Sequence, residues 1–219
     1  MKKAPRFSHG SGLLAVFVAA FIAASGILLG ACTSGPTMSE TAPASESTQA
    51  EVTAAYSKQI EQFSDGEAEY SGFYNNFEYK ATLLNTPIRT ALLQRQNQYY
   101  QWDRDKFTTE REKSEKEQAV ETAIFLSFYT PDHKNDNLVD KKSIWRIYLE
   151  AGGHRYEGKV KRLRSLLSEL QTLYPYHTRW NTPYLVTFPV STTAIETQAS
   201  TVTVTGPLGT RVVKFSATR

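Results

Sequence analysis

Most of the second half of the chain consists of short segments that alternate apolar and polar side chains or are apolar throughout. Residues 122–130 are TAIFLSFYT and residues 143–153 are SIWRIYLEAGG, and PYLVTFPV, STVTVTG and TRVVKFSA follow before the C-terminus. Aromatic and β-branched residues favour strands, and alternation places every second side chain on the same face. A Gly-Gly pair at 152–153 and a Gly-Pro-Leu-Gly turn at 206–209 indicate hairpins. The pattern predicts a mainly antiparallel β domain.

One earlier segment, residues 77–84 (FEYKATLL), has the same alternation and precedes a long stretch of helical character. Thr86 is a candidate N-cap, Pro87 suits the first helical position, and apolar residues recur at helical spacing in the stretch that follows. About six or seven short strands are typical of a sandwich of immunoglobulin size. We therefore expect an antiparallel immunoglobulin-like β-sandwich over residues 66–219, with a long helix at about residues 87–118 inserted after its first strand.

The N-terminal residues have the layout of an export signal. Residues 1–10 contain Lys2, Lys3 and Arg6 and no acidic residue, and residues 13–29 are uncharged and mostly apolar. A basic start, an apolar centre and small residues at the end are typical of a secretory signal peptide. An uncleaved membrane anchor is the alternative, because the apolar stretch approaches the roughly 20 residues that a spanning helix needs.

The only cysteine of the chain follows this apolar stretch almost directly. Leu29-Gly30-Ala31-Cys32 resembles the lipobox of bacterial lipoproteins, in which a leucine and two small residues precede the lipidated cysteine. The resemblance implies that residues 1–31 are removed, that the thiol receives a diacylglyceryl group, and that the new N-terminus is acylated, usually with palmitate. A thiolate is the nucleophile that accepts a lipid. The resemblance covers the signal region only.

Removal of the signal changes the charge of the protein. The chain contains 25 Lys and Arg residues and 22 Asp and Glu residues, and the loss of Lys2, Lys3 and Arg6 makes the two signs equal. A nucleic-acid-binding domain has a basic surface, so we expect no nucleic-acid partner. The partner that the resemblance implies is the lipid bilayer, which the N-terminal acyl chains enter.

The segment after the cysteine is predicted to be a tether. Residues 33–50 are mostly Ser, Thr, Pro, Ala and Glu, and such a composition cannot bury enough apolar surface to offset the entropy of ordering. We expect residues 32–65 to form the lipidated cysteine and a disordered linker. Within it, residues 52–63 could form a short helix with Tyr56, Ile60 and Phe63 on one face.

The residue after Cys32 indicates the destination of the protein. In enterobacterial lipoproteins an aspartate at this place retains the protein in the inner membrane, and this chain has Thr33 there. The resemblance therefore implies an outer-membrane protein, anchored by lipid, whose domain faces the periplasm. A Gram-positive host stays open as an alternative.

The sequence indicates no catalytic residue, no cofactor and no metal site. His133, His154 and His177 have no zinc-site spacing, and no nucleophile elbow, phosphate-binding loop or dinucleotide motif occurs. The Asp- and Asn-rich loop at residues 132–140 lacks the alternation and the glycine of an EF-hand, so we expect its side chains to bond their own backbone. A periplasmic, hydrolase-like enzyme whose site is assembled from distant residues is the alternative function.

An aromatic and proline-rich stretch, residues 174–184, is the candidate partner surface. Tyr176, Arg179 and Trp180 are its named members, because aromatic residues and arginine are enriched at interfaces with proteins. The alternative places these residues at the rim of the core. The basic run at 159–164 suits anionic headgroups or a solvated strand edge. We interpret the chain as a membrane-anchored envelope lipoprotein with a non-catalytic binding or scaffolding domain, and its partner as an envelope protein or a glycan.

Overall fold

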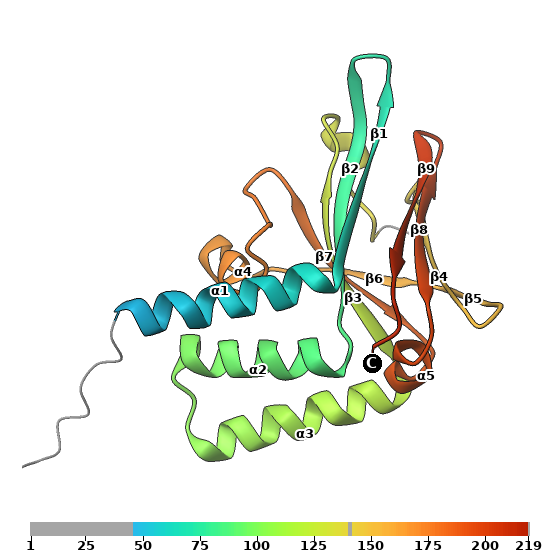
Figure 1. Cartoon of the computed structure of the whole chain (residues 1–219). Helices are drawn as coiled ribbons and strands as arrows, with labels where there is room; N and C mark the ends of the chain where they lie inside the picture. Colours follow the sequence, from blue (N-terminus) through green and yellow to red (C-terminus); the bar gives the residue numbers. More distant parts are fainter. Residues whose placement is uncertain (1–45, 140–141, 219) are drawn as a thin grey trace, which may run out of the picture. The chain divides into compact units, whose positions relative to one another are not determined.

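The computed structural model of the chain describes residues 46–139 and 142–218, which form nine antiparallel strands in two sheets together with helices (Figure 1). The predicted signal peptide, Cys32 and the first part of the predicted tether lie outside the described residues. The prediction of a mainly antiparallel β domain is confirmed.

Five strands form one sheet, here called sheet A, and four form the other, sheet B. Every pair of neighbouring strands is antiparallel. Sheet A has the order β1 (Ser64–Ser71), β2 (Tyr74–Leu83), β3 (Thr122–Tyr129), β7 (Thr182–Phe188) and β6 (Lys159–Arg162). Sheet B has the order β5 (His154–Glu157), β4 (Arg146–Ala151), β8 (Ser200–Gly206) and β9 (Gly209–Phe215).

The chain passes from sheet B to sheet A at Gly158, between β5 and β6. The Gly158 amide donates to the Ile147 carbonyl at 2.8 Å, and a Cβ at Gly158 would lie only 2.5 Å from the Val186 side chain. Only glycine permits this close approach. At the opposite edges, β9 lies beside β1, where the Lys214 amide donates to the Asp65 carboxylate at 3.0 Å. The two sheets are therefore joined along both edges.

The core lies between the two sheets. The alternation of β2 directs Phe77, Tyr79, Ala81 and Leu83 to one face, and all four are buried there, as the sequence predicts. Apolar residues of β3, β4, β7, β8 and β9 complete this cluster together with Trp145, which precedes β4; they include Phe128, Tyr184, Val204 and Val213. Period-two alternation thus gives each strand one core face.

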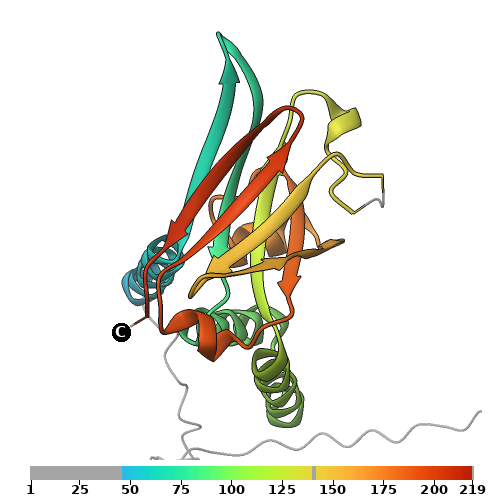
Figure 2. The same cartoon turned by 90° about the vertical axis from the view of Figure 1, so that its right-hand side faces the viewer.

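Helices cover the outer face of sheet A (Figures 1 and 2). A second apolar cluster joins residues of α1, α2 and α4 to outward-facing residues of β3, and the Phe125 and Tyr174 rings stack there at 3.6 Å between centroids. The helices are α1 (Glu46–Gln62), α2 (Thr86–Tyr100), α3 (Arg104–Val120), the short 3-10 helix η1 (His133–Asn135), α4 (Leu167–Leu173) and α5 (Thr192–Glu196).

The domain begins earlier than the sequence predicts. The short helix expected at residues 52–63 exists as α1, which is longer, and Ile60 is fully buried against the domain. The Tyr56 hydroxyl donates to the buried Leu173 carbonyl at 2.6 Å. The helix face that carries Tyr56 and Ile60 therefore packs against the domain, although the sequence places these residues in the tether.

The predicted long helix is two helices. Gln101 ends α2 with φ 52°, in the left-handed region, and Asp103 caps α3 by accepting the Lys106 amide at 2.7 Å. The N-cap of α2 is Asn85 and not Thr86, because the Asn85 side chain accepts the Ile88 amide at 3.1 Å. The left-handed backbone of Gln101 thus ends the first helix, and the capping side chain of Asp103 starts the second within the expected span.

The predicted immunoglobulin-like strand order is not confirmed. Immunoglobulin domains divide their strands as A-B-E-D and C-F-G, whereas the first three strands of this chain are neighbours in sheet A. The sequence pattern did not predict β1, whose residues SDGEAEYS are mostly polar. This strand is held by its pairing with β2 and by contacts with β9 rather than by an apolar face.

Candidate functional site

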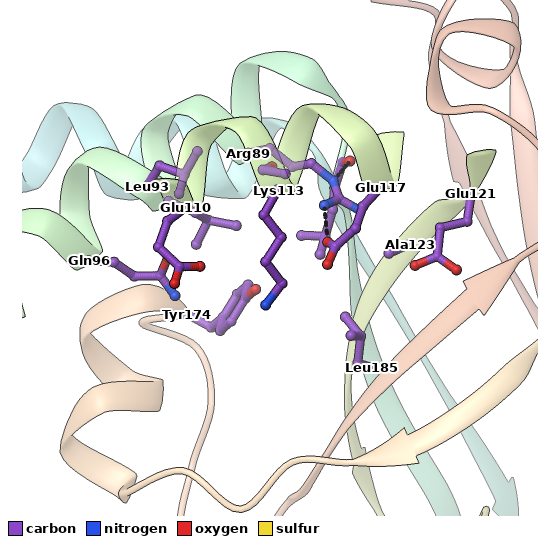
Figure 3. A pocket seen from close by; sticks show the side chains of 13 residues that line it. Arg89, Leu93, Gln96, Glu110, Lys113, Glu117, Glu121, Ala123, Tyr174 and Leu185 are labelled. Atoms are coloured by element: carbon purple, nitrogen blue, oxygen red, sulfur yellow. Dashed lines mark hydrogen bonds and ion pairs between the residues drawn. The ribbon is translucent and has the colours of Figure 1, made fainter. Parts of the chain in front are cut away.

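A pocket of about 190 Å³ lies between α2, α3 and the outer face of sheet A (Figure 3). One wall is apolar and the other contains charged side chains of both signs. The apolar wall includes Leu92, Ala123, Tyr174 and Leu185, and the polar wall includes Arg89, Gln96, Glu110, Lys113, Glu117 and Glu121.

Three of the charged side chains that line this pocket form ion pairs within the domain. The buried Arg89 donates through Nε to the Leu84 carbonyl and through Nη1 to the Glu117 carboxylate, both at 3.2 Å. A hydrogen bond from Lys106, at 2.6 Å, lowers the pKa of Glu110, and the charge of Lys113 adds to this effect. The Arg89–Glu117 pair joins α2 to α3, which has no buried residue of its own, so this pair already has a structural role.

A serine and a histidine meet on the outer face of sheet A. Ser127 Oγ lies 2.8 Å from His177 Nδ1, and the two residues are 1% and 2% exposed. Burial lowers the pKa of His177, so the imidazole is neutral near pH 7. No carboxylate among the described residues hydrogen-bonds to this histidine. The pair resembles two members of a hydrolytic triad, but without the acidic member that orients the histidine.

Ser127 lines one side of a groove of about 400 Å³ that opens toward β1 and β2. Lys80 lies directly opposite Ser127 in the β2–β3 register, and Tyr176, Thr178 and Asn181 line the other side. Sequence reasoning did not bring Ser127 and His177 together, because 50 positions separate them and neither belongs to a local motif.

The structure separates the three residues of the predicted partner surface. The Tyr176 hydroxyl hydrogen-bonds to the Thr82 hydroxyl, and burial raises the pKa of Tyr176. Trp180 is 66% exposed, and the Arg179 guanidinium carbon lies 4.7 Å from the centre of its ring. Arg179 and Trp180 therefore stay available to a partner, whereas Tyr176 belongs to the wall of the domain.

The tip of the β1–β2 hairpin presents three exposed aromatic side chains. We call residues 70–75 the hairpin tip. Phe73 is 104% exposed, Tyr74 80% and Tyr70 56%. Ser71 pairs with Tyr74, so Gly72 and Phe73 form a two-residue turn, and Gly72 has φ +63°. A glycine at the first position of such a turn is typical of a tight type II′ hairpin, which places Phe73 at the apex.

The base of the tip is fixed to both sheets. Pairing of β2 with β3 ends at Glu78, so the tip projects beyond sheet A (Figure 1). The Asn76 side chain donates to the Leu208 carbonyl at 3.3 Å, and the Thr130 hydroxyl donates to the Asn76 carbonyl at 3.0 Å. The tip is therefore a supported projection. The run YSGFYNNF could have indicated it, because aromatic residues flank a glycine turn there.

The two remaining candidate segments have structural roles. In the acidic loop, Asp132 accepts the Lys134 amide at 3.1 Å and Asn137 accepts the Val139 amide at 3.1 Å, as predicted. The basic run contains β6, which is the edge strand of sheet A. In the parts of the chain that the structure describes, no group of three or more His, Cys, Asp or Glu residues could hold a metal ion.

The described helices include none whose length and apolar character would allow it to cross a membrane. No protein-family model matches the chain, and no curated protein and no solved structure is detectably similar to it. A function must therefore be argued from the residues themselves.

Proposed function

We propose that this chain is a lipid-anchored envelope protein whose β domain binds another envelope component and catalyses no reaction. One observation supports binding most directly, which is the hairpin tip with its three exposed aromatic side chains on a supported base. Exposed aromatic groups that are grouped together are characteristic of interaction sites, since leaving them in water is unfavourable. The exposed Arg179–Trp180 pair is a second contact of the same chemistry.

The anchor is proposed from the lipobox resemblance. Cys32 would receive the diacylglyceryl group, and residues 33–45 would connect it to α1, in place of the longer tether that the sequence predicts. Two or more acyl chains give stable attachment to a bilayer. With Thr33 after the cysteine, we propose the outer membrane of a Gram-negative host as the location, with the domain in the periplasm.

Substitution of Cys32 tests the anchor. We expect Cys32→Ala to leave the precursor uncleaved and without lipid, because the chain has no other cysteine to modify. Mass spectrometry of the protein and density-gradient separation of the two membranes report acylation and location. A Cys32→Ala protein that is matured and fractionates like the wild type contradicts the lipoprotein proposal.

Photo-crosslinking in living cells tests the binding function. A photoreactive amino acid at Phe73 or at Trp180 should capture a specific envelope component, while the same amino acid at the exposed Glu112 of α3 serves as the matched control. Equal capture from all three positions, or none from any, contradicts binding at the proposed surfaces.

The hydrogen bond between Ser127 and His177 favours a second function, a periplasmic hydrolase. The burial of both side chains argues against this hydrolase function, because a nucleophile must contact its substrate. Hydrolysis of a chromogenic ester that disappears in Ser127→Ala, with folding unchanged, would favour this alternative over the non-catalytic one.

A further inference from the structure

We propose that the hairpin tip inserts its aromatic side chains into the interfacial layer of the bilayer to which the chain is anchored. The inference goes beyond the binding function above by naming a lipid surface as the contact of the tip, and it rests on the proposed lipid anchor. Four observations support the inference. The tip is uncharged and aromatic, its rings lie on both faces of the hairpin, the neighbouring carboxylates are paired within the domain, and the chain between Cys32 and α1 is long enough for anchor and tip to contact one bilayer.

The chemistry of the tip matches a membrane interface. From Tyr70 to Phe77 the chain has no charged residue, and it contains only aromatic residues, asparagine, serine and glycine. Tyrosine and phenylalanine have a large apolar ring and lose little side-chain conformational entropy when they are buried. A tyrosine hydroxyl can also stay in the hydrated headgroup layer. Tyrosine, which supplies two of the three exposed rings, is enriched where membrane proteins cross the interface.

The aromatic side chains point to both sides of the hairpin. Tyr70 pairs with Asn75, whereas Tyr74 pairs with Ser71, and paired residues of neighbouring strands share a face. Tyr70 and Tyr74 therefore lie on opposite faces, with Phe73 at the apex between them. A flat protein surface can cover only one of these faces. A bilayer surrounds an inserted tip on all sides, so it can cover the three rings together.

The acidic groups next to the tip are engaged within the domain. Arg211 forms an ion pair with Glu69 at 2.9 Å, and Asn75 donates to the Glu78 carboxylate at 3.2 Å. Arg211 also donates to the Ala68 carbonyl, so the guanidinium is held at the base of the tip. An ion pair and a hydrogen bond at this level reduce the repulsion that two free carboxylates would meet near an anionic headgroup.

The length of the chain allows anchor and tip to contact the same bilayer. The start of α1 and the tip are joined by a helix of 17 residues and a strand of 8, about 25 Å and about 26 Å long. Figure 1 shows that α1 and β1 meet at a steep angle, so the direct separation is shorter than the sum. Residues 33–45 can span up to about 45 Å when extended, which is enough for both ends to reach one surface.

The test places a single environment-sensitive fluorophore beside the tip. Ser71→Cys keeps all three aromatic residues and adds one free thiol, because the proposed diacylglyceryl thioether occupies the Cys32 sulfur. The labelled full-length protein is reconstituted into vesicles of phosphatidylethanolamine and phosphatidylglycerol. Ala194→Cys, an exposed position on α5 away from the tip, is the matched control.

We expect the Ser71 label to become several-fold brighter and blue-shifted on reconstitution, and to be quenched by lipids brominated on the acyl chain. The Ala194 label should remain in water. Adding Phe73→Ser to the Ser71→Cys protein should return the label to water without changing acylation. High salt should leave the wild-type response almost unchanged, because the tip has no charge.

The outcomes separate this inference from the proposed function. Mass spectrometry reads the acyl chains independently, so an unacylated protein contradicts the proposed anchor. An acylated protein whose Ser71 label stays in water overturns the insertion alone. A label that responds only when native membranes with their proteins replace the pure lipids overturns it too, since the contact would then be a protein. Equal fluorescence changes of the labels at Ser71 and Ala194 would also overturn the insertion.

Discussion

Phe73 and Phe77 are the same residue type, lie four positions apart in one hairpin, and have opposite environments. Phe77 is fully buried, and its ring centroid lies 4.8 Å from that of Trp145, which directly precedes β4, and 6.0 Å from that of Phe128 in sheet A. Phe73 is fully exposed at the apex of the tip. The difference arises from what lies opposite each ring. The rings of Trp145 and Phe128 pack against Phe77, whereas the apex of the hairpin projects beyond the rest of sheet A (Figure 1).

This comparison separates two roles that an aromatic side chain can have. Phe77 contributes to stability, because its burial removes apolar surface from water and fills the space between the sheets. Phe73 adds no buried surface to the domain, so any benefit that it gives must come from a contact outside the domain. Four experiments test this division, beginning with the largest expected effect.

Truncation of Phe77 should have the largest effect. We expect Phe77→Ala to lower the free energy of unfolding by about 3–5 kcal/mol, because it leaves a cavity beside Trp145 and Phe128. Guanidinium denaturation followed by near-UV circular dichroism measures the loss. Phe77→Leu, which keeps most of the apolar volume, is the control and should cost clearly less. Equal losses for the two variants would show that the cavity is not the cause.

The buried, titratable His177 can test how burial decides the role of a side chain. Burial lowers the pKa of His177 in the folded state, so below about pH 6.5 the unfolded state binds more protons than the folded one. The contribution of His177 is therefore complete at higher pH and is lost as the pH falls through the unfolded value toward the lowered folded value.

His177→Asn provides the matched measurement for this pH effect. We expect the variant to be less stable than the wild type at pH 8, by less than the Phe77 truncation, and the difference to narrow as the pH falls toward 5. Groups that titrate in both proteins cancel in the comparison. A stability difference that is constant or that widens on acidification contradicts a buried neutral histidine.

Asn76 lies at the boundary between the buried and the exposed part of the hairpin. Asn76→Ala removes the side-chain hydrogen bond to the Leu208 carbonyl and should cost about 1 kcal/mol. Amide hydrogen exchange over residues 70–75 should become faster, while exchange over the paired part of β2 should not change. Unchanged exchange at the tip would mean that the hairpin needs no support from the β8–β9 turn.

Phe73→Ser should have the smallest effect on stability. We expect the free energy of unfolding to change by no more than about 0.5 kcal/mol, because the side chain has no buried surface to lose. Denaturation of Phe73→Ser and Phe77→Ala under the same conditions compares the losses in free energy of unfolding directly. A loss above about 1 kcal/mol would place Phe73 among the residues that stabilise the domain, and would weaken its assignment to an outside contact.

Strands with strict alternation were predictable from the sequence. Residues 77–84 alternate with period two, and each of their core-facing residues is buried as expected, because the direction of a side chain in a strand is a local property. The helical character of the segment after Pro87 was also local. The break at Gln101 was not predicted, since one residue in a left-handed conformation leaves almost no trace in an apolar pattern.

The errors concern segments whose stability comes from distant partners. The polar sequence of α1 resembles a linker, yet Tyr56 bonds to Leu173, 117 positions away, and Ile60 packs in the same apolar cluster. β1 is polar and exists through its pairing with β2 and its contacts with β9. Composition describes the average polarity of a segment. Folding depends instead on the few side chains of that segment that pack against a complementary surface.

The sequence by itself determined the period of the strictly alternating strands, the positions of the hairpin turns at residues 152–153 and 206–209, and the equal numbers of basic and acidic residues outside the N-terminal basic segment. It also contains the lipobox-like segment on which the proposed anchor depends. Only the tertiary structure decided that Phe77 is buried and Phe73 exposed, that Tyr176 faces the domain while Trp180 faces water, and that Ser127 meets His177. The physical reason is that backbone geometry is set by neighbours in the chain, whereas burial depends on which distant strand or helix lies opposite.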